Sequence, residues 1–212
     1  MSWKKIAIIY AFIFSSLFAQ KYTIGINYSG LNVNNNLNFI SEFSLEGNYL
    51  FPQNKLSVGI ISSIISAQHE HLVIGAAAVN EISFGLALNA KYHPFTYSIT
   101  ASKYIQPFLG TGIGNFLSNT FSISGNLKSC DQHFSFSVNN YFYSYLSVGG
   151  ILGSDLFQFI IEAKYQIRKP EINYDKPNCI NGNYDEKNQY TKLSKTANLN
   201  ILILGIGINI FF

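Results

Sequence analysis

The feature that most constrains the fold of this chain is a strict alternation of apolar and polar side chains over long stretches. From Glu81 to His93 every second residue is apolar, and the residues between them are mostly polar or small. The same period of two runs from Phe157 to Arg168. Because neighbouring side chains of a β-strand point to opposite faces, both stretches are predicted to be strands with one apolar and one polar face.

Strand length and charge content distinguish a membrane barrel from a soluble β-sandwich, two folds whose strands share this alternation. In a soluble β-sandwich the apolar faces point into the core, so alternation alone is compatible with that fold as well. The runs are, however, about 11 to 14 residues long, closer to the roughly 9 to 11 residues of a tilted membrane strand than to the 5 or 6 of a soluble strand. Only 12% of the residues are charged, against roughly 25% in ordinary soluble domains. Both observations favour strands whose apolar face meets lipid.

The first twenty residues have the pattern of a secretory signal peptide. Lys4 and Lys5 precede an almost wholly apolar stretch from Ile6 to Phe18, and Ala19 supplies a small residue for cleavage. The apolar stretch is about a dozen residues long, short of the roughly 18 that a spanning helix needs. We therefore expect residues 1–20 to be a cleaved signal peptide, with the exact cleavage position open, and residues 21–212 to form one barrel domain. A buried N-terminal helix is the alternative.

The rest of the chain contains no continuous apolar run of spanning length, so membrane helices are not expected. The remaining spanning structure is a closed barrel, because backbone N–H and C=O groups inside a bilayer need partners within the protein. We predict an all-β fold, an eight-stranded antiparallel up-and-down transmembrane β-barrel. The expected strands are Lys21–Ser29, Asn38–Phe51, Leu56–Ala67, Glu81–His93, Tyr104–Leu117, Phe136–Leu152, Leu156–Arg168 and Thr196–Phe212.

The connections between these strands alternate in length. The short turns are Pro52–Lys55, His93–Lys103 and Gly153–Asp155. The longer loops are Gly30–Leu37, Gln68–Asn80, Ser118–Ser135 and Lys169–Lys195. Outer-membrane barrels combine short periplasmic turns with long extracellular loops, so this order predicts that both termini lie in the periplasm.

The last expected strand carries a resemblance to a known group of proteins. Ile208, Ile210 and the terminal Phe212 lie on one face, which resembles the C-terminal signal that the barrel-assembly machinery recognises in outer-membrane β-barrels. Residues 106–114 and 159–165 likewise resemble the fifth and seventh strands of the OmpA/OmpX-like barrel superfamily. This resemblance implies a place in the cell outer membrane. We expect the barrel alone, without the peptidoglycan-binding domain of full OmpA-type proteins.

Charged residues on the inward phase of the strands are expected to fill the lumen. An eight-stranded barrel is just wide enough for side chains to fill its interior, and ion pairs among them would offset the cost of burying charge. A narrow ion path is the alternative. The expected network consists of Glu42, Glu46, Glu81, Lys91, Glu162, Lys164 and Arg168.

Aromatic residues make up 16% of the chain. Several of them fall near the expected periplasmic strand ends, where amphipathic rings form an interfacial girdle in membrane proteins. The alternative is an ordinary aromatic core. The expected girdle residues are Tyr49, Phe51, Tyr92, Phe157 and Phe212.

Cys130 and Cys179 are the two cysteines of the chain, and each lies in an expected extracellular loop. In an exported chain this pair predicts a disulfide between the third and fourth loops. Two free thiols are the alternative.

One group of residues invites a catalytic interpretation. His133 and Ser135 are two residues apart, and Glu162 would complete an arrangement resembling the barrel lipid A deacylases. Both residues border a Ser- and Asn-rich loop, however, where such side chains are common. We therefore expect no catalytic site.

Other chemical motifs are weak. His69, Glu70 and His71 would make a poor metal site on a flexible loop. The glycines at 110, 112 and 114 alternate on a strand face, where they relieve crowding or help the sheet bend, and do not form a phosphate loop. A formal net charge of +3 is too small for a nucleic-acid surface. No cofactor is expected.

The sequence therefore predicts a non-enzymatic outer-membrane barrel with a structural or surface-interaction role. Its external loops, especially Lys169–Lys195, would contact lipopolysaccharide, a host protein or a neighbouring protein. A narrow pore for small solutes or ions is the first alternative, and a lipid A-modifying hydrolase is the second. Fold analogy does not choose among them.

Overall fold

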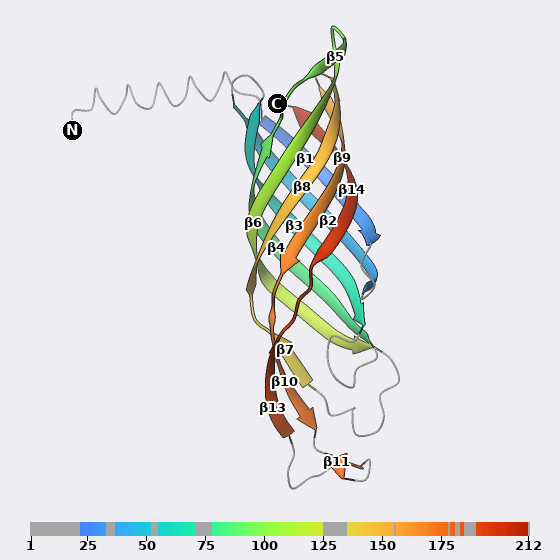
Figure 1. Cartoon of the computed structure of the whole chain (residues 1–212), viewed down its shortest axis with the longest axis vertical. Helices are drawn as coiled ribbons and strands as arrows, with labels where there is room; N and C mark the ends of the chain where they lie inside the picture. Colours follow the sequence, from blue (N-terminus) through green and yellow to red (C-terminus); the bar gives the residue numbers. More distant parts are fainter. Residues whose placement is uncertain are drawn as a thin grey trace, which may run out of the picture.

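Eight long strands form a closed antiparallel barrel in the computed structural model (Figure 1). The structure describes residues 22–32, 37–51, 55–70, 78–124, 135–154, 156–177, 179–180, 183–184 and 190–211. The wall consists of β1 (Tyr22–Asn32), β2 (Leu37–Leu50), β3 (Leu56–Glu70), β4 (Ala78–Tyr92), β6 (Lys103–Ser124), β8 (Tyr141–Ser154), β9 (Phe157–Arg168) and β14 (Ile201–Phe211). The predicted eight-stranded fold is confirmed.

Each wall strand pairs with its neighbours in the sequence, and the first strand closes the ring with the last. Thr23 of β1 lies opposite Phe211 of β14, and the pairing continues to Asn32 opposite Ile203. The contact between β4 and β6 joins the two remaining edges. The described part of the chain contains no helix long and apolar enough to cross a membrane.

The wall is apolar outside and polar inside, the reverse of a soluble core. On β4, the outward side chains of Ile82 and Leu88 are 58% and 63% exposed, whereas Glu81 is fully buried and Lys91 is 4% exposed. Period two therefore separates a lipid-facing surface from a filled lumen, as in transmembrane barrels.

A second sheet projects from one end of the barrel (Figure 1). It contains β7 (Ser135–Val138), β10 (Glu171–Pro177) and β13 (Tyr190–Thr196) in the order β13-β10-β7. We call this end the sheet end. We call the opposite end, where β1 begins and β14 finishes, the terminus end. The short strands β11 (Cys179–Ile180) and β12 (Asn183–Tyr184) pair with each other.

The second sheet corrects two expectations. Phe136–Leu152 was predicted as one strand, but the chain leaves the wall at the exposed pair Asn139 and Asn140, so β7 joins β10 and only β8 lies in the barrel. The region 169–195 was predicted as a loop, yet β10 and β13 form a hairpin there. As a result β14 begins at Ile201 and not at Thr196.

The terminus end corrects a third expectation. His93–Lys103 was predicted as a short turn, but it contains β5 (Tyr97–Thr100), which pairs with the start of β6. The apolar residues within this segment give it enough β-propensity to extend the hairpin beyond β4. In Figure 1, β5 stands at the terminus end.

Candidate functional site

Three ion pairs between lysine or arginine and glutamate cross the described part of the lumen. Two of them meet β2: Lys91 of β4 lies 2.7 Å from Glu46, and Lys164 of β9 lies 2.7 Å from Glu42. All four side chains are at most 7% exposed. Such pairs are retained in a low-dielectric interior only where further hydrogen bonds satisfy the remaining polar atoms.

Side-chain amides supply those hydrogen bonds. Asn27 and Asn89 donate to Glu46 at 3.2 and 2.5 Å, and Gln166 donates to Glu42 at 3.1 Å. Each of the two carboxylates therefore has one cationic and at least one neutral donor. This arrangement fixes the position of the carboxylates across strands that are far apart in the sequence.

The third ion pair lies nearer the sheet end, where Glu81 of β4 binds Arg168 of β9. The carboxylate of Glu81 also lies 2.6 Å from the His69 Nε2 and accepts a hydrogen bond of 2.7 Å from Ser83. The guanidinium of Arg168 lies 4.8 Å from the centre of the Phe116 ring. Arg168 and Glu81 are fully buried, so their charges neutralise each other inside the protein.

Glu162 is the one charged residue of the expected network that forms no ion pair within 4.0 Å among the described residues. It lies on β9 opposite Gly205 of β14 and Gly149 of β8. Its charge acts from a greater distance on both Lys91 and Lys164. The structure thus brings six of the seven expected residues into ion pairs and leaves Glu162 near two of them.

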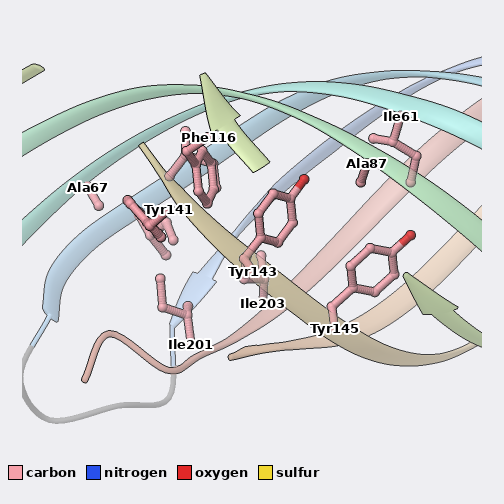
Figure 2. Close-up of a cluster of buried hydrophobic side chains, with 11 residues drawn as sticks. Ile61, Ala67, Ala87, Phe116, Tyr141, Tyr143, Tyr145, Ile201 and Ile203 are labelled. Carbon is pink, nitrogen blue, oxygen red and sulfur yellow. The ribbon is translucent and has the colours of Figure 1, made fainter. Parts of the chain in front are cut away.

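A cluster of apolar side chains lies inside the barrel next to the ion pairs of Lys164 and Arg168 (Figure 2). Phe116 of β6 stacks on Tyr143 of β8, with ring centres 4.4 Å apart. The cluster also draws side chains from β2, β3, β4 and β14. Its buried members are Ile40, Ile61, Ile65, Ala67, Ala87, Phe116, Tyr141, Tyr143, Tyr145, Ile201 and Ile203.

A second apolar cluster joins the barrel to the projecting sheet. Val79 of β4 packs with Ile172 and Tyr174 of β10, and Phe121 and Ile123 of β6 pack against them. The side chains of β10 that face the barrel are therefore buried, and this small core attaches the projecting sheet to the rim of the barrel.

The opposite face of the projecting sheet is polar. Cross-strand pairing places Ser194, Asn173 and Ser137 in one row. Lys192 lies opposite Asp175 in the next row. A hollow of about 500 Å³ is lined by residues of these rows together with Tyr174 and Leu193. Glu171 also lies on this face and accepts a hydrogen bond of 2.8 Å from Ser194. The face therefore offers both hydrogen-bond donors and acceptors, with one lysine beside two carboxylates.

Aromatic residues gather around the terminus end of the wall. The Tyr49 ring lies 5.7 Å from that of Tyr22 and 4.8 Å from that of Phe51. Tyr92 and Phe157 are 50% and 48% exposed on the outer surface. This position matches the interfacial girdle of membrane barrels. The expected fifth member, Phe212, lies outside the described residues.

Solved structures with the same architecture include outer-membrane proteins of bacteria. OprG from Pseudomonas aeruginosa superposes with a TM-score of 0.63 and 15% identity over 91% of this chain and 96% of that one. A major outer membrane protein from Thermus thermophilus superposes with a TM-score of 0.51 and 12% identity over 92% of this chain and 100% of that one. The chain has the fold of the small outer-membrane β-barrels. No protein-family model and no curated protein sequence matches it.

The structure separates two of the residues that were considered for a catalytic site. Ser135 lies on β7 opposite Asp175 of the projecting sheet, whereas Glu162 lies within the wall on β9. His133 lies outside the described residues. Ser135 and Glu162 therefore do not form the arrangement that the sequence suggested.

The expected metal and disulfide residues are only partly described. His69 points into the barrel toward Glu81, and His71 lies outside the described residues. Within the described part, no group of three or more His, Cys, Asp or Glu side chains is arranged to hold a metal ion. Cys179 begins β11, and Cys130 lies outside the described residues, so the disulfide stays a prediction.

The assembly signal of the barrel is described in part as well. Ile208 and Ile210 of β14 are 47% and 43% exposed on the outer surface, on the expected face. Phe212 follows the last described residue.

Sequence reasoning missed the neutral members of the lumen network. Asn27, Asn89 and Gln166 all occupy inward positions, and His69 and Tyr141 contact Glu81. The alternation of the strands was enough to predict that the three amide side chains point into the barrel. His69 was placed in a loop because β3 was expected to end at Ala67, three residues before its observed end.

Proposed function

We propose that this protein is a non-enzymatic, non-conducting barrel of the outer membrane, which displays the β13-β10-β7 sheet at the cell surface for binding. The observation that supports this most directly is the pairing of a filled lumen with a folded polar sheet at one end. Ion pairs and aromatic rings occupy the space that a pore would need. Loops and small sheets on a rigid scaffold are where binding functions usually reside.

The proposed orientation follows from the lengths of the connections. At the terminus end, β8 and β9 are joined through Asp155 and Leu156, and β2 and β3 through residues 51–55. The segments that carry β7, β10 and β13 are at the other end. Short turns face the periplasm in barrels of this kind. We therefore place the sheet end outside the cell.

The chemistry of the polar face favours a hydroxyl-rich ligand. A sugar hydroxyl both donates and accepts hydrogen bonds, so it needs a surface that offers both. Asn173, Ser137, Ser194, Asp175 and Lys192 supply amide, hydroxyl, carboxylate and ammonium groups side by side. Lys192 lies opposite the carboxylate of Asp175, so this face gives little attraction for phosphate. The saccharide of lipopolysaccharide is the ligand of this type that surrounds an outer-membrane protein.

Binding of lipopolysaccharide-derived polysaccharide tests the proposal. The probe is the saccharide freed of its lipid by mild acid, measured by calorimetry against the barrel in phosphatidylcholine vesicles. Replacing Asn173→Ala and Asp175→Ala together should weaken binding about thirtyfold, since two lost hydrogen bonds cost roughly 1 kcal/mol each and 1.4 kcal/mol is tenfold.

The matched control is Ser122→Ala, which removes an exposed hydroxyl from β6 that does not line the hollow on the polar face. It should bind as the unchanged protein does. If the unchanged protein does not bind the saccharide, or if both variants bind equally well, the polar face is not a saccharide site.

A further inference from the structure

The hairpin of β5 and the start of β6 carries an exposed apolar surface at the terminus end. All four residues of β5 are exposed. Tyr97 is 66% and Ile99 is 49% exposed, and Phe95 just before the strand is 63% exposed. Exposed apolar groups gathered on one short element mark a contact surface.

The hairpin, like the barrel wall, has an apolar outer face and a more polar face on the other side. Tyr97 lies opposite Ile105, which lies opposite Leu152 of β8. Ile105 and Leu152 are 45% and 50% exposed on the outer surface. Tyr97 therefore continues the outer apolar surface, and Ser98 occupies the other face. A bulge between Ser98 and Thr100 interrupts the alternation at Ile99 and places Thr100 opposite Lys103, which is on the same face of β6 as Ile105.

The part of β5 beyond Tyr97 is short enough to lie within the headgroup layer of a bilayer. Tyr97 lies opposite Ile105, which is exposed on the outer surface of β6. Ile99 lies two residues beyond Tyr97, which corresponds to roughly 5 Å along the barrel axis at about 3.3 Å per residue and about 40° of tilt. The headgroup layer is about 5 to 8 Å thick on each side of the hydrocarbon core.

We propose that the outer face of the β5–β6 hairpin is embedded in the phospholipid headgroup layer at the terminus end. Tyr97 and Ile99 contact the glycerol and upper acyl region, and the exposed Lys103 at the turn lies at the depth of the phosphates. Aromatic and lysine side chains are the residues that membrane proteins place at this depth. Continuity with the apolar wall makes lipid the occupant, in preference to a second copy of the chain or a soluble partner.

Single tryptophans report the depth of each face. Trp3, the one tryptophan of the chain, lies in the expected signal peptide, so the barrel refolded from residues 21–212 has no tryptophan emission of its own. Tyr97→Trp then probes the outer face of β5, and Ser98→Trp, its neighbour on the other face, is the matched control. Both are placed in phosphatidylcholine vesicles that contain lipids brominated near the headgroup or deep in the chain.

We expect the tryptophan at position 97 to emit at shorter wavelength and to be quenched by the shallow bromines at least about twofold more than the one at position 98. Acrylamide in the water should quench position 98 more strongly. If acrylamide quenches both positions equally and bromine quenches neither, the hairpin lies in water and the proposal fails.

Two further results are decisive. The first is the dependence on the ratio of lipid to protein. If position 97 is protected from acrylamide only when the vesicles contain little lipid per protein, a second copy of the chain covers it, and the proposal is overturned. Should Tyr97→Trp fail to give a strand-dominated circular dichroism spectrum, Ile105→Trp, which lies opposite position 97 on the outer face, replaces it as the probe. Ser98→Trp stays the control, and the same quenching contrast is expected.

Discussion

At the residue scale, the lumen depends on charges that are neutralised and hydrogen-bonded together. Glu81 shows this most fully, because it contacts Arg168, His69, Ser83 and Tyr141 while being fully buried. A buried ion pair contributes little net stability compared with an apolar pair of equal volume. Removing one partner, however, leaves the other as an uncompensated charge, and that cost is large.

Replacing Glu81→Gln should therefore lower the free energy of unfolding by about 3 to 5 kcal/mol, because the Arg168 guanidinium loses its counter-charge. Urea unfolding of the barrel in lipid vesicles measures this change. Ser122→Ala is the control and should stay within about 0.5 kcal/mol of the unchanged protein. Adding Arg168→Met to Glu81→Gln should recover part of the loss. If Glu81→Gln leaves the urea concentration at the unfolding midpoint unchanged, the ion pair between Glu81 and Arg168 is not formed.

At the scale of the element, small inward residues decide how closely wall strands and interior side chains approach. A Cβ added at Gly114 of β6 would lie 2.5 Å from the Leu86 carbonyl oxygen of β4 and 2.7 Å from the Cβ of Ala87. The carbonyl oxygen and the Cβ are both fixed to the backbone of β4, so neither can make room unless β4 itself shifts. A Cβ added at Gly47, on the outer face of β2, would have no atom within 4 Å.

These two glycines form a matched pair for a packing test. Gly114→Ala should destabilise the barrel by about 1 to 3 kcal/mol, as overpacking does. Gly47→Ala should be neutral or slightly stabilising, because it meets no neighbour and reduces the freedom of the unfolded chain. Urea unfolding in the same vesicles compares them. Equal losses at both positions would contradict a steric origin.

The period of two predicted most wall strands closely, because burial in a barrel depends on that period alone. Asn38–Phe51 was expected and β2 runs from Leu37 to Leu50. The same pattern cannot predict which charges pair, since Lys91 and Glu46 are brought together by strand stagger. Nor does it predict β7, β10 and β13, which are short and are stabilised by one another.

At the scale of the whole molecule, the filled lumen predicts that the barrel does not conduct. Ion pairs cross the interior, and the aromatic rings of Phe116, Tyr143 and Tyr145 are buried inside the barrel beside them. An eight-stranded barrel leaves little space beyond its own side chains. The cluster between the projecting sheet and the barrel adds further apolar side chains at the sheet end.

Planar bilayers that contain the purified protein should therefore show no discrete current steps. Tyr143→Ala combined with Tyr145→Ala removes two interior rings, and this variant should give detectable openings because it widens the interior. The unchanged protein acts as its reference. Regular steps from the unchanged protein would favour a narrow pore and contradict the filled lumen.

The pairing of β1 with β14 has a consequence for the order in which this protein matures. The first wall strand obtains its second neighbour only when the last one has been made, since no other strand of the described chain pairs with that edge of β1. Until then the sheet has two open edges, and open edges recruit other chains. A product interrupted before Ile201 therefore lacks the strand that closes the barrel. Its seven wall strands leave both edges open, so we expect it to aggregate. Closure of the other seven wall strands therefore depends on the eleven residues of β14.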